Sequence, residues 1–113
     1  MLFRSPQNVR AITNSSSSII LYWLPPSIDQ QNGVITRYGV RVSSNDPSQT
    51  LDLRMTSNTT ALPITGLQAY TNYSFMVQAV NSAGVGPYSS IVTNKTFEAG
   101  KINLPFVKEA SIV

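Results

Sequence analysis

Few side chains in this chain have the chemistry of a catalytic or metal-binding group. The sequence contains no histidine and no cysteine, which supply the commonest general bases, nucleophiles and soft metal ligands of proteins. Its five carboxylates fall in separate turns or strand segments: Asp29, Asp46, Asp52, Glu98 and Glu109. Because these groups do not cluster, we expect no enzyme activity, no cofactor and no metal site.

Four asparagines begin an Asn-x-Ser/Thr sequence, the acceptor signal for N-linked glycans: Asn14, Asn58, Asn72 and Asn94. The first two lie in polar turns, where a glycan has room, and Asn72 has the outward parity of a strand. The pattern does not decide which face Asn94 occupies. We therefore predict glycans at Asn14, Asn58 and Asn72; the alternative is that serine-rich turns spell the motif by chance.

Eight basic residues against five acidic ones give a net charge of +3, but the basic residues are scattered along the chain. This distribution does not favour a nucleic acid partner. Arg37 and Arg41 share the outward parity of one strand segment, and Arg54 lies on another. Three arginines on one face can bind the sulfate groups of heparin-like glycans, or they form a solvated row that discourages edge pairing.

The longest apolar run, residues 19–24, has six residues, whereas a membrane-spanning helix needs about 20. We therefore expect no direct insertion into a membrane. Residues 1–4 are too few to form a signal peptide, so a secreted parent protein is expected to be longer than this chain.

The elements that must carry these groups are short strands, because apolar and polar residues alternate and no helical period occurs. Strands are expected at residues 7–13, 17–23, 35–43, 51–55, 60–64, 72–80 and about 89–98. In the last segment two sets of residues compete for the inner face: Ile91, Thr93, Lys95 and Phe97, or Val92, Asn94 and Thr96. Seven short strands separated by turn signals predict an all-β sandwich. Its expected core includes Trp23, Tyr38, Leu67 and Tyr73.

Leu67 and Tyr73 resemble the tyrosine corner of Greek-key sandwiches, in which the ring packs inward and the hydroxyl bonds upstream backbone. From residue 6 to about residue 98 the wider pattern is similar to that of a fibronectin type III domain. The matching residues are Pro6, Val9, Trp23, Pro25, Pro26, Asn32, Gly33, Tyr38, Val40, Val42, Leu67, Thr71, Tyr73, Asn81, Gly84, Gly86, Pro87 and Ser89. One departure is Ala69, where the family often has proline.

The resemblance implies a seven-stranded Greek-key β-sandwich of the immunoglobulin-like class. It places the first, second and fifth strands in one sheet and the third, fourth, sixth and seventh in the other. We expect residues 1–5 to be an N-terminal flank, 6–98 the domain, and 99–113 a C-terminal tail or linker. The apolar tail could dock on the domain, start a following module or mediate assembly. Residues 111–113 also fit the loose pattern of a carboxyl-terminal ligand of PDZ domains. That interpretation requires Val113 to be the natural end of the chain and to lie in the cytosol, whereas the sequons indicate a secreted chain.

The loops at residues 24–33 and 81–88 are expected at one end of the sandwich, the first candidate for a loop-mediated contact. Some family members carry an integrin-binding Arg-Gly-Asp tripeptide in the second loop. This chain has Ser82, Ala83, Gly84 and Val85 there. These four residues are a candidate partner-binding loop, and a purely structural turn is the alternative.

The resemblance implies a non-catalytic module of an extracellular or cell-surface protein that acts as a rigid spacer and binds other proteins, including neighbouring modules of its own chain. The alternatives are an intracellular structural module of a scaffold protein and a glycosaminoglycan-binding module. A cytokine-receptor module is disfavoured, because the chain has one tryptophan and no cysteine.

Overall fold

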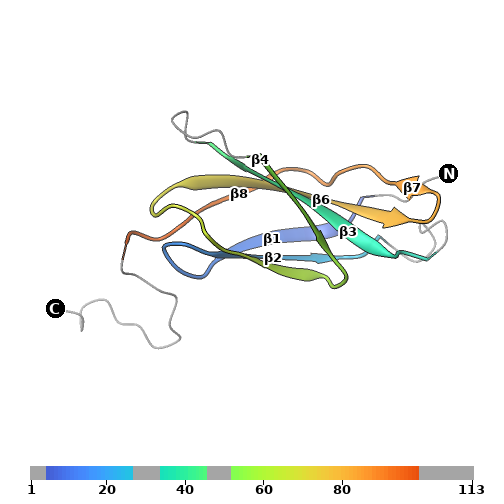
Figure 1. Cartoon of the computed structure of the whole chain (residues 1–113), viewed down its shortest axis with the longest axis horizontal. Coiled ribbons are helices and arrows are strands. Elements are labelled where there is room, and N and C mark those ends of the chain that lie inside the picture. The colour runs from blue at the N-terminus through green and yellow to red at the C-terminus, as the bar shows by residue number, and fades with distance from the viewer. Residues whose placement is uncertain (1–4, 27–33, 46–51, 100–113) are drawn as a thin grey trace.

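The computed structural model describes residues 5–26, 34–45 and 52–99, which form two antiparallel β-sheets packed face to face (Figure 1). No helix occurs in these three ranges. The strands are β1 Gln7–Thr13, β2 Ile19–Leu24, β3 Arg37–Ser44, β4 Asp52–Ser57, β5 Ala61–Ile64, β6 Asn72–Asn81, β7 Gly84–Val85 and β8 Val92–Lys95. The expected all-β sandwich is confirmed.

One sheet has the strand order β1-β2-β5, and the other has the order β4-β3-β6, with β7 and β8 both paired to β6. The strands therefore divide between the sheets as expected. β8 is shorter than the expected segment 89–98, and β7 is an additional short strand. The two are separated by Pro87, which has no N–H to donate to a ladder.

Several strands begin or end one or two residues from the expected positions. β2 begins at Ile19, two residues late, because the preceding turn includes Ser18. The backbone N–H groups of Asn14 and Ser15 both donate to the carbonyl of Ser18, at 3.0 and 3.1 Å. These bonds close the turn before the strand begins.

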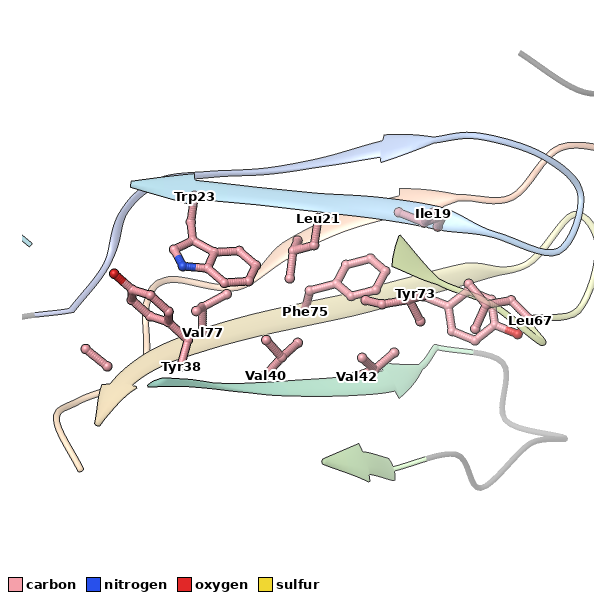
Figure 2. Packing of buried hydrophobic residues seen from close by; sticks show 12 residues of the cluster. Ile19, Leu21, Trp23, Tyr38, Val40, Val42, Leu67, Tyr73, Phe75 and Val77 are labelled. Atoms are coloured by element: carbon pink, nitrogen blue, oxygen red, sulfur yellow. The ribbon is translucent and has the colours of Figure 1, made fainter. Parts of the chain in front are cut away.

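The core lies between the two sheets and is formed by side chains of alternate residues (Figure 2). Trp23, Tyr38, Leu67 and Tyr73 are all buried there, and the rings of Trp23 and Tyr38 meet edge-on with their centroids 5.4 Å apart. Leu53 is different: the alternation assigns it to the inner face, yet it is 39% exposed, because β4 is the outer strand of its sheet.

One side of the sandwich is closed by contacts between β1 and the segment that contains β8. The hydroxyl of Thr13 donates to the carbonyl of Lys95 at 2.7 Å, and the side-chain amide of Asn94 donates to the carbonyl of Ala11 at 2.7 Å. The backbone N–H of Phe97 donates to Ser15 at 3.2 Å. These bonds tie the edge of one sheet to the edge of the other.

The described part of the chain starts and finishes at opposite ends of the sandwich (Figure 1). Gln7 pairs with Leu24 at the end where Trp23 meets Tyr38. The last strand instead finishes beside the turn between β1 and β2, where Phe97 bonds Ser15. Segments attached at these two ends would therefore be held apart by the length of the sandwich.

Candidate functional site

The loop between β5 and β6 is held by the hydroxyl of Tyr73. This hydroxyl accepts a hydrogen bond from the backbone N–H of Gln68 at 2.8 Å, while the ring is buried. Thr96 makes a second tie: its hydroxyl accepts from the N–H of Thr71 at 3.0 Å and donates to the carbonyl of Gln68 at 2.6 Å. The sequence indicated the first tie and left the face of Thr96 open.

Next to this corner lies Tyr70, whose ring is exposed and whose backbone adopts an unfavourable conformation. Its φ angle is +53°, a left-handed conformation that costs an ordinary residue about 1–2 kcal/mol. The backbone N–H donates to the carbonyl of Phe97 at 2.9 Å, and the side chain is 60% exposed. The ammonium of Lys95 lies 3.5 Å from the centroid of the Tyr70 ring. A hollow of about 170 Å³ is bordered by Asn45, Tyr70, Thr71, Asn72 and Lys95.

The four sequons differ in how freely their asparagines can be reached. Asn14, Asn58 and Asn72 are exposed, although the side-chain nitrogen of Asn14 donates to the hydroxyl of Ser18 at 3.2 Å. Asn94 is half-buried, and the nitrogen that would carry a glycan bonds Ala11. Its amide oxygen accepts from the N–H of Lys95 at 2.8 Å. The amide of Asn94 therefore serves the closure of the sandwich.

The structure brings the three predicted arginines onto one sheet. Arg41 and Arg54 are direct partners in the β3–β4 ladder, so their side chains lie on the same outer face. Arg37 lies four residues before Arg41 on β3 and therefore shares that face. Arg37 and Arg54 are exposed, and Arg41 is half-buried.

The candidate loop of residues 82–85 is a turn braced by Asn81. The side-chain oxygen of Asn81 accepts from the N–H groups of Ala83 and Gly84, at 2.8 and 3.0 Å. Ser82 and Ala83 are exposed at its tip, and Val85 is 48% exposed in β7. Residues 27–33 of the other loop lie outside the described residues.

The outer face of the β1-β2-β5 sheet is unexpectedly apolar. The ladder registers place Ile12, Ile20 and Pro63 in one row across the three strands, and Arg10, Tyr22 and Ala61 in the next. Ile12 is 44% exposed and Leu24, farther along β2, is 48% exposed. The guanidinium of Arg10 lies 5.6 Å from the centroid of the Tyr22 ring. The sequence signal was the apolar character of alternate residues 20, 22 and 24.

Antiparallel sheets with one face on a core usually present polar side chains on the other. A contiguous apolar patch on the outer face of a sheet is a candidate surface for contact with another protein. We call the face formed by Arg10, Ile12, Ile20, Tyr22, Leu24, Ala61 and Pro63 the apolar face.

No group of three acidic, histidine or cysteine side chains that could hold a metal ion occurs in residues 5–26, 34–45 and 52–99. The same ranges contain no helix long and apolar enough to cross a membrane. The described residues present three candidate surfaces on a Greek-key β-sandwich: the apolar face, the face that carries Arg37, Arg41 and Arg54, and the turn at residues 82–85.

The fibronectin type III domain model matches residues 4–95, and the chain belongs to that family. It is 34% identical over 96 residues to mouse neogenin, covering 84% of this chain and 6% of that protein. It is 34% identical over 97 residues to mouse receptor-type tyrosine-protein phosphatase F, covering 86% of this chain and 5% of that protein. A solved structure of domains A168–A170 from titin superposes with a TM-score of 0.74 and 26% identity, covering 86% of this chain and 33% of that one.

Proposed function

We propose that this chain is a non-catalytic module of a cell-surface receptor or adhesion protein, which spaces its neighbours and contacts other proteins. The observation that carries the proposal is the match to a receptor-type relative, in which a segment of this size makes up 5% of the length. Attachment points at opposite ends of the sandwich suit a spacer, because the rigid core then sets the distance between adjoining segments.

The apolar face supports the contact function. Three strands spaced by about 4.8 Å and rising about 3.3 Å per residue give a face on the order of 300 Å². This area is below the roughly 800 Å² per partner of a stable interface and matches the low end of contacts between modules. The face suits a protein surface that is itself apolar and carries one carboxylate opposite Arg10.

Replacing Ile20 by threonine together with Tyr22 by serine tests whether the apolar face is available. The double variant should bind less of the hydrophobic dye ANS than the parent chain, at unchanged circular dichroism. Met76→Thr, on the outer face of the other sheet, is the matched control and should leave dye binding unchanged. Equal dye binding by the double variant and the parent would remove this surface from the proposal.

Binding of a sulfated glycan is a second candidate function, favoured by the pairing of Arg41 with Arg54. The ladder places both guanidinium groups on one outer face, where each can donate hydrogen bonds to a sulfate group of the same glycan. Arg54→Gln should lower the salt concentration that elutes the chain from immobilised heparin. Arg10→Gln removes one charge from the opposite sheet and should elute as the parent does. Identical shifts for both variants would indicate net charge alone.

An intracellular structural module is the main alternative, and the similarity to titin domains supports it. N-linked glycans separate the two, because cytosolic chains do not receive them. The test is the intact mass of the chain expressed in animal cells behind a signal peptide, before and after enzymatic removal of glycans. A loss of mass that maps to Asn14, Asn58 or Asn72 supports the cell-surface proposal. A folded, secreted and unmodified chain would contradict it.

A further inference from the structure

The hollow beside β6 brings a sequon asparagine together with an exposed aromatic ring. Asn72 is the direct ladder partner of Lys95, so the two side chains share the outer face of the sheet with Cβ atoms roughly 5 Å apart. The ammonium of Lys95 lies over the Tyr70 ring, 3.5 Å from its centroid. The Tyr70 ring, the Lys95 ammonium and Asn72 therefore border one open space, and Asn45 and Thr71 also line it.

The backbone that carries the Tyr70 ring is held by hydrogen bonds at residue 70 and at the residue that follows it. The N–H of Tyr70 bonds Phe97, and the next residue, Thr71, donates its N–H to the buried hydroxyl of Thr96. Thr71 also donates its own hydroxyl to the carbonyl of Ala69 at 2.9 Å. Because this backbone is already ordered, only the side-chain rotations of Tyr70 are lost when something packs against its ring.

We propose that Asn72 carries an N-linked glycan whose first sugar lies in this hollow against the Tyr70 ring, an inference that rests on the proposed cell-surface function. One side of an N-acetylglucosamine ring is a surface of C–H groups, which packs on an aromatic ring by dispersion and by exclusion of water. The sugar takes the place of the Lys95 ammonium over the ring, and the displaced ammonium and the Asn45 amide donate hydrogen bonds to the hydroxyl and acetamido oxygens at the sugar's rim.

The glycan arrives by transfer from a lipid-linked oligosaccharide diphosphate, the co-reactant that this proposal requires. The side-chain nitrogen of Asn72 forms a bond to C1 of the first sugar, and the bond from C1 to the diphosphate oxygen breaks. One amide proton leaves and the lipid diphosphate is the leaving group. Asn72 is the acceptor in this transfer, and Tyr70 and Lys95 act only on the attached sugar.

The other predicted sequons lack this arrangement. No aromatic residue occurs within two positions of Asn14 or Asn58, whereas Tyr70 and Tyr73 flank Asn72. The side-chain nitrogen of Asn14 is also hydrogen-bonded within its own turn. We therefore expect the glycan at Asn72, and not those at Asn14 and Asn58, to stabilise the fold.

The first experiment maps glycan occupancy by mass spectrometry on the full chain secreted from animal cells. Chains with Asn14→Gln and Asn58→Gln are then trimmed enzymatically to one sugar at Asn72 and compared with the same chains made in bacteria. The sugar should raise the melting temperature by on the order of 4 °C, a typical effect of one good contact in a domain of this size. Tyr70→Phe should keep this increment and Tyr70→Leu should abolish it. In NMR spectra the sugar C–H protons should shift upfield only when residue 70 is aromatic.

The possible results test three statements separately: the glycan at Asn72, its contact with Tyr70, and the proposed cell-surface function. Glycans at Asn14 or Asn58 with none at Asn72 would overturn the inference and leave the proposed function standing. A secreted chain with no glycan at any site would overturn both. A glycan at Asn72 that stabilises the parent and Tyr70→Leu equally, without the upfield shift, would refute the contact with Tyr70.

Discussion

Replacing Tyr73 by phenylalanine removes one hydroxyl from the corner between β5 and β6 and leaves the ring in place. The ring is 1% exposed, and its hydroxyl accepts the backbone N–H of Gln68 at 2.8 Å. The change therefore deletes an acceptor while the packing of the aromatic ring is retained. What is tested is whether this bond fixes the loop or merely accompanies it.

The size of the effect follows from the fate of the Gln68 N–H. A typical hydrogen bond contributes about 0.5–1.5 kcal/mol, and a donor left buried without a partner costs about 1–3 kcal/mol. Because the Gln68 residue is exposed, water can reach part of the released group, which favours the lower values. We expect a loss of about 1–1.5 kcal/mol of unfolding free energy. For a domain of this size that loss lowers the melting temperature by about 5–10 °C.

The assay is equilibrium unfolding in urea at neutral pH, followed by Trp23 fluorescence. The midpoint should fall while the dependence of free energy on urea is unchanged, since the surface exposed on unfolding is nearly the same. Tyr70→Phe is the control: its ring is 60% exposed, and the change should cost less than about 0.5 kcal/mol. If the two variants lose the same free energy, the hydroxyl of Tyr73 does not hold the corner.

Three further variants test the core and the closure of the sandwich. Trp23→Ala, at the largest fully buried side chain, should lower the unfolding free energy by about 3–5 kcal/mol in the same urea assay; a cost below about 2 would contradict its central position. Thr96→Val keeps the shape of a buried side chain but removes the hydrogen bonds of its hydroxyl to Gln68 and Thr71, and should cost about 1–3 kcal/mol; a neutral result would show that water replaces them. Burial raises the pKa of the Tyr38 hydroxyl, so the folded state holds this proton more tightly than the unfolded state does, and stability should fall as the pH rises above about 10. Tyr38→Phe should flatten that alkaline loss, and an unchanged pH profile would assign the loss to other groups.

The tyrosine corner and the positions of most strands could be expected from the sequence, because each depends on a local pattern. The division of the strands between the two sheets was implied only by the resemblance to fibronectin type III domains. Alternation of apolar residues decides which side chains face the core, and turn residues decide where the chain reverses. The hydroxyl of Tyr73 finds its partner five residues upstream, within the same loop. Interactions between residues so close in the chain can be predicted from the spacing of the residues in the sequence.

The sequence could not predict which residues of the last strand face the core, because polar and apolar residues occur at both odd and even positions. Thr96 is 2% exposed while Ile91 is 62% exposed, the reverse of their polarity. Burial of Thr96 is decided by its bonds to Gln68 and Thr71, which lie more than twenty residues away. A hydrogen-bond requirement elsewhere in the fold outweighed the hydrophobic preference of the strand itself.

The candidate surfaces, like the fold, have some features that follow from the local sequence and others that depend on contacts between distant segments. The residue pattern predicts the strand faces and the turns. It therefore also predicts the outward parity of Arg41, Arg54 and Asn72, since side chains alternate with a period of two along any strand. Which outward side chains meet depends on how the strands pair in the folded chain: Arg41 lies beside Arg54, and Asn72 lies beside Lys95 near the Tyr70 ring. Alternation is a property of the local backbone, whereas the register between strands is set by packing of segments that are distant in the chain.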